Sequence, residues 1–171
     1  MSRITLSGPS SGPMFAPLLR GTYYRAIDPN FAGYAIAGSR RAGRYSRSGE
    51  PTLYLSSSVE GVEAAMIAHH DARPSSLQIV EIDVEATGIF DLRDESSLRN
   101  AGIEVSDAIA PWQEIANAGG TPRSWKVRDR LIEMGANGLI DPSRKRPGLW
   151  HLVLFRWNEG NGPRVHVRNS G

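Results

Sequence analysis

The sequence predicts a single α+β domain with a mixed, mostly antiparallel sheet and flanking helices. Segments rich in β-branched and aromatic residues outnumber the segments with helical periodicity. The helical segments fall between the strands irregularly, without the regular strand–helix alternation of a doubly wound parallel sheet. The 171 residues, 40% of them hydrophobic, suffice for one domain with a sizeable core.

The first part of the chain predicts a tail, a strand and a long loop. Residues 1–17 are rich in Gly, Ser and Pro, so we expect a flexible tail followed by one domain over residues 18–171. Residues 21–27 (GTYYRAI) have the composition of a strand. Residues 28–51 form a Gly-rich loop, and a loop of this length in a compact domain usually has a function.

The next segment predicts a strand that leads directly into a helix. Residues 52–56 (TLYLS) form the strand. Ser57 and Glu60 have the spacing of a capping box, in which each side chain binds the backbone N–H of the other residue. Apolar residues at helical spacing then predict a helix to about residue 72.

The middle of the chain predicts two strands and three helices. Residues 77–84 (LQIVEIDV) alternate between apolar and polar side chains, as in a half-buried strand, and residues 88–92 form a shorter one. Helical patterns cover residues 95–101 and 107–117. A third helix opens with Thr121 as cap and Pro122 in its first turn, and runs to Met134 before Gly135.

Three further strands complete the predicted sheet. Residues 137–143 form a short strand that ends in a turn. Residues 149–157 are the most apolar stretch of the chain, which indicates a central strand. Residues 164–169 are predicted to form an edge strand.

The composition excludes several classes of protein. The chain has no cysteine, so it has neither disulfides nor a thiol nucleophile. No stretch approaches the roughly 20 apolar residues of a membrane span, and the N-terminus lacks a signal peptide. We therefore expect a cytoplasmic protein that does not bind membranes.

Few motifs indicate a metal site or a common catalytic site. His69 and His70 are adjacent, so they point to different faces of the predicted helix, and we expect no metal. The phosphate-binding P-loop and the G-x-S-x-G motif of serine hydrolases are both absent. The arginines of the long loop, together with nearby tyrosines, leave RNA binding or cleavage open as a less favoured alternative. These arginines are Arg40, Arg41, Arg44 and Arg47.

A set of separated residues has the chemistry needed to bind a dinucleotide such as NAD. Two arginines, Arg25 and Arg44, suit a pyrophosphate, and we expect Arg47 to be solvated. Tyr54 suits packing against a flat ring. A carboxylate near a ribose stabilises the positive charge that develops when a glycosidic bond breaks. The candidate carboxylates are Glu60 and Glu63, and Ser143 completes the set.

Three stretches of the chain follow a known sequence pattern. They are YYRAI (23–27), GRYSRSGEPTLYLSSS (43–58) and GANGLIDPSRKRPGLWHLVLF (135–155). They resemble the RES domain family, bacterial toxins that are paired with a Xre-type antitoxin. The central stretch follows the family pattern G-R-W-N-P-x-G-x-P-A-L-Y-L-S-x-S without a gap. Its matching positions are Gly43, Arg44, Tyr45, Gly49, Pro51, Leu53, Tyr54, Leu55 and Ser58.

The resemblance covers most of residues 20–157, although residues 93–120 match no pattern. It implies a fold similar to that of ADP-ribosyltransferases and an enzyme that uses NAD as its substrate. By position, Arg25 and Ser143 resemble the arginine and serine after which the family is named. Arg44 and Tyr54 resemble two further residues that contact NAD.

The family's third eponymous residue, a glutamate, falls on Ala65 in this chain. Glu63 can replace it if the helix shifts locally, whereas Glu60 is engaged in the predicted capping box. A weaker site favours transfer of ADP-ribose to a protein acceptor over efficient hydrolysis, since a bound nucleophile is already positioned. Two alternatives stay open: depletion of NAD by a glycohydrolase or phosphorylase, and an inactive relative that only binds NAD.

The resemblance also implies a cognate antitoxin as the partner. We expect it to cover a cleft between Arg44 and Ser143, with an acidic or C-terminal segment placed near the arginines. The acceptor of ADP-ribose and the oligomeric state do not follow from the sequence.

Overall fold

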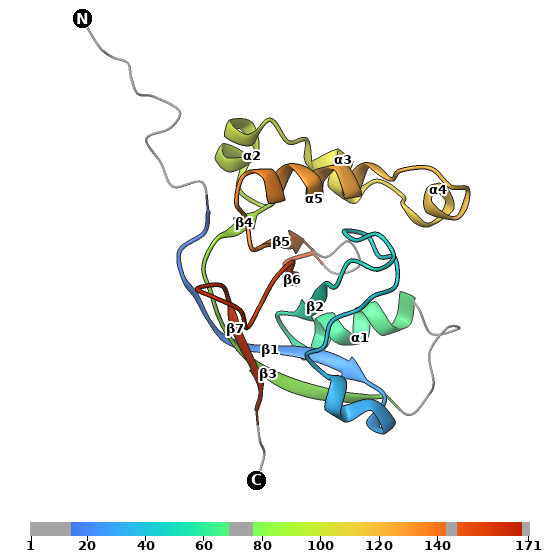
Figure 1. The fold of residues 1–171 in the computed structure, drawn as a ribbon, viewed down its shortest axis with the longest axis vertical. Helices are drawn as coiled ribbons and strands as arrows, with labels where there is room; N and C mark the ends of the chain where they lie inside the picture. Colours follow the sequence, from blue (N-terminus) through green and yellow to red (C-terminus); the bar gives the residue numbers. More distant parts are fainter. Residues whose placement is uncertain (1–14, 69–76, 143–146, 169–171) are drawn as a thin grey trace, which may run out of the picture.

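The computed structural model describes residues 15–68, 77–142 and 147–168, without the side chains of residues 64–68. Within these residues, seven strands form one sheet in the order β4-β5-β6-β2-β1-β3-β7 (Figure 1). The strands are β1 (Leu19–Ile27), β2 (Leu53–Ser56), β3 (Gln78–Ala86), β4 (Ile89–Asp91), β5 (Gly138–Pro142), β6 (Trp150–Leu154) and β7 (Arg164–Val167). The pair β4–β5 is parallel and the other described pairs are antiparallel. The predicted α+β fold with a mixed, mostly antiparallel sheet is therefore confirmed.

The sheet has two parts that meet at one point. Within the described residues, β1 and β2 share the residue pair Tyr24–Ser56, and this pair joins β4-β5-β6-β2 to β1-β3-β7. Figure 1 shows β1 and β3 running side by side beneath β2 and β6. One apolar core spans both parts, with Ile82 from β3 packed in the same cluster as Leu152 from β6.

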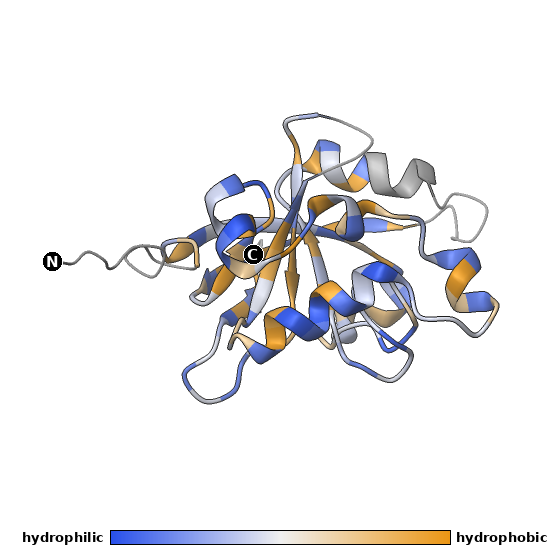
Figure 2. Ribbon diagram, turned by 90° about the horizontal axis from the view of Figure 1, so that it is seen from above, coloured by the Kyte–Doolittle hydropathy of each residue, from blue (hydrophilic) through white to orange (hydrophobic). Residues whose placement is uncertain are grey.

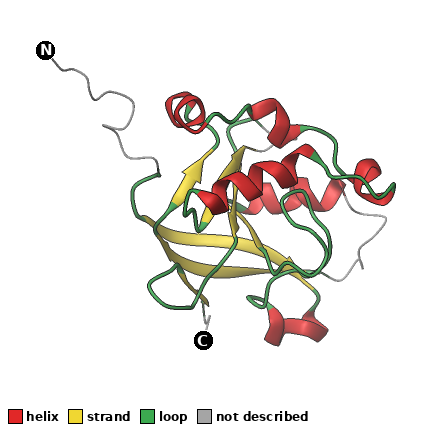
Figure 3. Cartoon of the chain, turned by 45° about the horizontal axis from the view of Figure 1, so that its top comes forward, coloured by secondary structure: helices red, strands yellow, loops and turns green. Residues whose placement is uncertain are grey.

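Within the part of the chain that the structure describes, five α-helices flank the sheet. They are α1 (Val59–Ala68), α2 (Glu95–Ala101), α3 (Val105–Ile109), α4 (Gln113–Asn117) and α5 (Arg123–Glu133). Figure 3 shows α2 to α5 gathered on one side, where a second core forms between helix residues such as Leu131 and strand residues such as Leu139. Figure 2 shows apolar residues along the central strands and hydrophilic residues on the outer loops. A 3-10 helix (Pro29–Tyr34) interrupts the long loop before β2.

Helix α1 begins one residue later than the capping box predicted. The Ser58 hydroxyl accepts the backbone N–H of Gly61 at 3.0 Å, so the cap is Ser58 and not Ser57. Glu60 lies in the first turn and is exposed. The predicted end of this helix, near residue 72, lies outside the described residues.

Two predicted helices also differ in detail. The helix expected over residues 107–117 is two short helices, α3 and α4, because Pro111 forces the preceding Ala110 into an extended conformation. In α5, Pro122 occupies the cap position that was predicted for Thr121. The other predicted strands and helices are present with ends that differ by at most three residues, and α2 has the predicted ends.

The packed part of the chain begins before residue 18. The backbone N–H of Ala16 donates to the carbonyl of Ile89 at 2.7 Å, and Phe15 packs against the core under the helices. None of the described helices is long and apolar enough to cross a membrane.

Candidate functional site

The long loop before β2 contains a tight turn at residues 43–46, called here the arginine turn. Backbone hydrogen bonds between Gly43 and Ser46 close it in both directions, at 2.8 and 3.3 Å. The pair Ser39–Thr52 closes the base of the surrounding loop. The conformation of Arg44 is therefore set by a short closed turn.

Tyr54 of β2 supports this turn with its hydroxyl group. The hydroxyl accepts the backbone N–H of Tyr45 at 3.1 Å and lies 2.8 Å from the Ser46 hydroxyl. Burial raises the pKa of the Tyr54 phenol, so this group stays protonated near neutral pH. The structure thus brings together Arg44 and Tyr54, two residues of the predicted set.

The Arg44 side chain points from the turn to the end of α3. Its Nη1 donates to the carbonyl oxygens of Ala110 at 2.7 Å and Ala108 at 3.2 Å. The side chain is half-buried. These bonds restrict the guanidinium to one orientation before any ligand arrives, which lowers the entropy cost of binding an anion.

Arg25 lies on β1 at the other end of the long loop. Its Nη1 donates to the carbonyl of Ala35 at 2.7 Å, and Ala35 is 2% exposed. Arg25 therefore holds the first half of the loop, as Tyr54 holds the second half. The neighbouring residue on β1, Tyr24, forms the junction with β2.

The other two predicted residues are Glu63 and Ser143. Glu63 is exposed on α1. This helix packs on the β1–β2 junction at Gly61, where a Cβ atom would lie 3.3 Å from that of Ser56. Ser143 lies outside the described residues, and it follows Pro142, the last residue of β5.

A row of polar residues crosses four strands beside the turn, and no sequence pattern predicted it. Asp141 pairs with His151, His151 with Ser56, and Ser56 with Tyr24. The Ser56 hydroxyl lies 3.0 Å from Nδ1 of His151. Each of the four strands contributes one residue, so the row exists only once the strands are paired.

Tyr45 connects this row to the arginine turn. Its side chain is fully buried, and its hydroxyl donates to Oδ1 of Asp141 at 2.8 Å. Asp141 is 4% exposed, so the hydrogen bond compensates part of the cost of burying a carboxylate. The family pattern has an aromatic residue here, but the sequence alone did not identify its partner.

Arg47 is not the solvated residue that was expected. It forms two hydrogen bonds of 2.8 Å with the carboxylate of Asp129 on α5. Its guanidinium also lies 5.4 Å from the centroid of the Trp125 ring. Arg47 therefore attaches the loop to α5.

Acidification is expected to weaken this attachment. The hydrogen bonds from Arg47 lower the pKa of Asp129 in the folded protein. The stability that the pair contributes is present above about pH 3.9, the pKa of an aspartate in the unfolded chain. It is lost as the pH falls through the lower pKa of Asp129 in the folded protein. The pair is partly exposed, so solvent screening keeps its contribution below about 1 kcal/mol.

Thermal unfolding of Asp129→Asn and wild type at several pH values measures this effect. The wild type should be more stable at pH 7, and the difference should shrink below about pH 4. Asp107→Asn is the matched control, because its ion pair with Arg123 is longer, at 3.8 Å, and exposed. A difference that does not change with pH would contradict the prediction.

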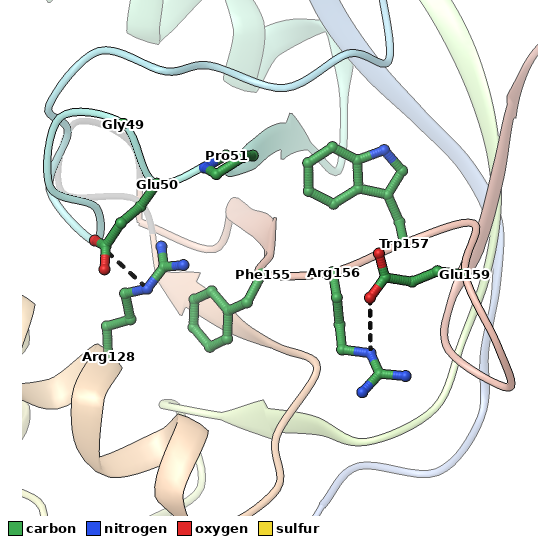
Figure 4. Close-up of a pocket in the computed structure, with 8 residues that line it drawn as sticks. All are labelled: Gly49, Glu50, Pro51, Arg128, Phe155, Arg156, Trp157 and Glu159. Carbon is green, nitrogen blue, oxygen red and sulfur yellow. Dashed lines mark ion pairs between the residues drawn. The ribbon is translucent and has the colours of Figure 1, made fainter.

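The described residues contain no group of three or more side chains suited to hold a metal ion. A cavity of about 490 Å3 lies between Glu50, Arg128 and Trp157 (Figure 4). None of the predicted site residues lines it. The candidate site is therefore the arginine turn with β2 and the polar row, and not this cavity.

Comparisons with known proteins agree with this architecture. A family model described as "RES domain" matches residues 19–170. Among solved structures, the chain is similar to one in the crystal structure of the M. tuberculosis MbcT-MbcA toxin-antitoxin complex, with a TM-score of 0.60 and 17% identity. The match covers 88% of this chain and 82% of that chain, which shows a shared fold. No curated protein matches the chain.

Proposed function

Because the chain belongs to the RES domain family, we propose that it is the toxin of a bacterial toxin–antitoxin system and that it acts on NAD. The observation that carries the proposal is the family match together with the arginine turn, which carries Arg44 and is held by the Tyr54 hydroxyl. The similarity to a chain of a toxin-antitoxin complex supports the same class of function.

In the proposed reaction, the bond between the nicotinamide nitrogen and C1′ of the ribose breaks. The bonding electron pair moves to the nicotinamide ring, which leaves as a neutral molecule. An acceptor nucleophile gives an electron pair to C1′ and loses its proton. We propose a protein side chain as acceptor, which makes the enzyme a mono-ADP-ribosyltransferase; water or phosphate in its place would make it a glycohydrolase or phosphorylase.

Each site residue has a proposed role. Arg25 and Arg44 bind the anionic pyrophosphate, since guanidinium groups bind phosphate oxygens through two hydrogen bonds. The Tyr54 ring packs against the ligand while its hydroxyl holds the turn. Glu63 stabilises the charge that develops on the ribose. Ser143 is assigned to NAD binding by its position in the family pattern alone.

We also propose a Xre-type antitoxin that covers the cleft between Arg44 and Ser143. An acidic or C-terminal segment of the antitoxin would occupy the place of the anionic ligand. A complex that leaves these residues open and is still toxic would contradict this arrangement.

Labelled NAD distinguishes the possible reactions. Purified protein is incubated with NAD labelled in the adenosine part, alone and with cell extract. Label on a protein band indicates a transferase, and label only in free ADP-ribose indicates a glycohydrolase. RNA is incubated in parallel, because degradation of RNA with NAD intact would favour an RNA-cleaving toxin. The ion pair between Arg47 and Asp129 weighs against RNA, since it neutralises one of the four arginines of the basic loop.

The charge of Glu63 is expected to matter for the rate. Glu63→Gln keeps the size of the side chain, and we expect it to lower nicotinamide release by about tenfold, equivalent to roughly 1.4 kcal/mol of barrier. Glu60→Gln is a matched control on the same helix, because Glu60 is also exposed and does not cap it. Equal rates for wild type and Glu63→Gln would show that this carboxylate plays no part.

A further inference from the structure

Helix α5 donates hydrogen bonds to three consecutive carbonyl groups of the arginine turn. Nε1 of Trp125 donates to the Gly43 carbonyl at 2.7 Å. The Ser124 hydroxyl donates to the Arg44 carbonyl. Nη1 of Arg128 donates to the Tyr45 carbonyl at 2.8 Å. One face of one helix therefore binds the turn residue by residue.

These three donors are buried. Ser124 is 0%, Arg128 5% and Trp125 9% exposed. Buried donors need acceptors, because an unpaired one retains the full cost of its lost hydration. The sequence of α5 thus places hydrogen-bond donors at three buried positions, and all three bind the same turn.

Arg128 extends this contact to the far end of the loop. Its Nη1 also donates to the Thr52 hydroxyl at 2.7 Å, immediately before β2. Figure 4 shows its guanidinium between Glu50 and Phe155; the Phe155 ring centroid lies 4.8 Å away and the Glu50 carboxylate 3.9 Å from Nε. One side chain therefore connects the turn, the start of β2 and α5.

The opposite side of the turn is fixed by β2. The Tyr54 hydroxyl accepts a hydrogen bond from the N–H of Tyr45, while Arg128 of α5 donates one to the carbonyl of the same residue. Both β2 and α5 thus hold the backbone around Arg44. Its side chain extends from this fixed backbone to the end of α3.

We propose that Ser124, Trp125 and Arg128 are positioning residues that hold the arginine turn so that Arg44 is ready to bind the anionic part of NAD. The proposal rests on the function proposed above for Arg44. Suppose that loss of a donor leaves only one tenth of the molecules with the turn in the conformation that binds NAD. The apparent affinity for NAD then falls tenfold, while bound NAD reacts at an unchanged rate.

Ser124→Ala and Trp125→Phe test the proposal, since each removes one donor and keeps most of the packing. Lys126→Ala is the control, because Lys126 lies on the same helix and is exposed. Three measurements are made: amide hydrogen exchange of residues 40–50 without ligand, titration with ADP-ribose for its Kd, and steady-state kinetics with NAD for kcat and KM. Circular dichroism and thermal unfolding establish that each variant is folded.

We expect amide exchange at the turn to be faster in both donor variants than in wild type. The control variant should exchange at the wild-type rate. The Kd for ADP-ribose and the KM for NAD should rise about tenfold, with kcat within about twofold of wild type. A fall in kcat at unchanged KM would indicate loss of folded enzyme and would overturn the positioning role. Unchanged exchange, or faster exchange with unchanged Kd, would overturn it as well.

The outcome also separates this proposal from the proposed function. A wild-type protein that neither binds ADP-ribose nor consumes NAD overturns the proposed function and the ligand named here. Hydrogen exchange in the ligand-free variants still decides in that case whether the three donors hold the turn.

Discussion

Arg25→Ala is expected to abolish growth arrest when the protein is expressed without an antitoxin. Removal of one well-placed charged group from such a site typically lowers the rate by a factor on the order of 10²–10³. Arg25 is half-buried on β1 and its guanidinium is held by the Ala35 carbonyl, so a lysine would supply the charge without the same geometry. Colony counts after induction and NAD consumption by the purified variant measure the effect.

The control for Arg25→Ala lies on the same strand. Arg20 is also paired across β1 and β3, but its side chain is 70% exposed and forms a surface ion pair with Glu85. Arg20→Ala should therefore retain growth arrest. Because Arg25→Ala leaves the Ala35 carbonyl without this donor, the fold of the variant must be verified by circular dichroism. A folded Arg25→Ala protein that still arrests growth would refute the role of Arg25.

Gly43→Ala is expected to displace the arginine turn. A Cβ atom at this position would lie 2.6 Å from the Tyr54 hydroxyl oxygen and 3.1 Å from the Ser46 hydroxyl oxygen. The turn cannot easily move away, since α5 and β2 hold it from both sides. We expect a loss of about 1–3 kcal/mol in the free energy of unfolding, typical of a buried steric conflict.

The same substitution should weaken binding of ADP-ribose at least about tenfold, because Arg44 follows directly in the chain. Denaturant unfolding and titration with ADP-ribose measure the two effects. Gly33→Ala is the control, since a Cβ atom there has no neighbour within 4 Å. Wild-type stability and affinity in Gly43→Ala would show that the close approach to Tyr54 has no role.

The family and most of the strand segments could be predicted because their signals are local. The alternation in β3 and the apolar run of β6 follow from neighbouring residues in the chain. The glycine before Arg44 was visible as part of a motif, yet the motif did not say why a glycine is needed. The reason is the hydroxyl of Tyr54, 11 positions later in the chain.

Errors at helix ends arose where several local signals competed. Ser57 and Ser58 both suit a helix cap, and the spacing to Glu60 favoured the wrong one. Pro111 lies within an otherwise helical pattern, and its effect on Ala110 separated α3 from α4. Between the two serines, tertiary packing decides, because the competing preferences for a cap differ by only about 1 kcal/mol.

By itself, the sequence determined the α+β class and the family, and it predicted a role for Arg44 and Tyr54. Only the tertiary structure decided which groups hold that turn. Ser124, Trp125 and Arg128 lie about 80 residues from it and read as ordinary helix residues. Likewise, the polar row joins Asp141, His151 and Ser56 from three strands. Buried polar groups need hydrogen-bond partners, and these partners are neighbours in space that can lie far apart in the chain. Local sequence spacing therefore predicts neither the groups that hold the turn nor the members of the polar row.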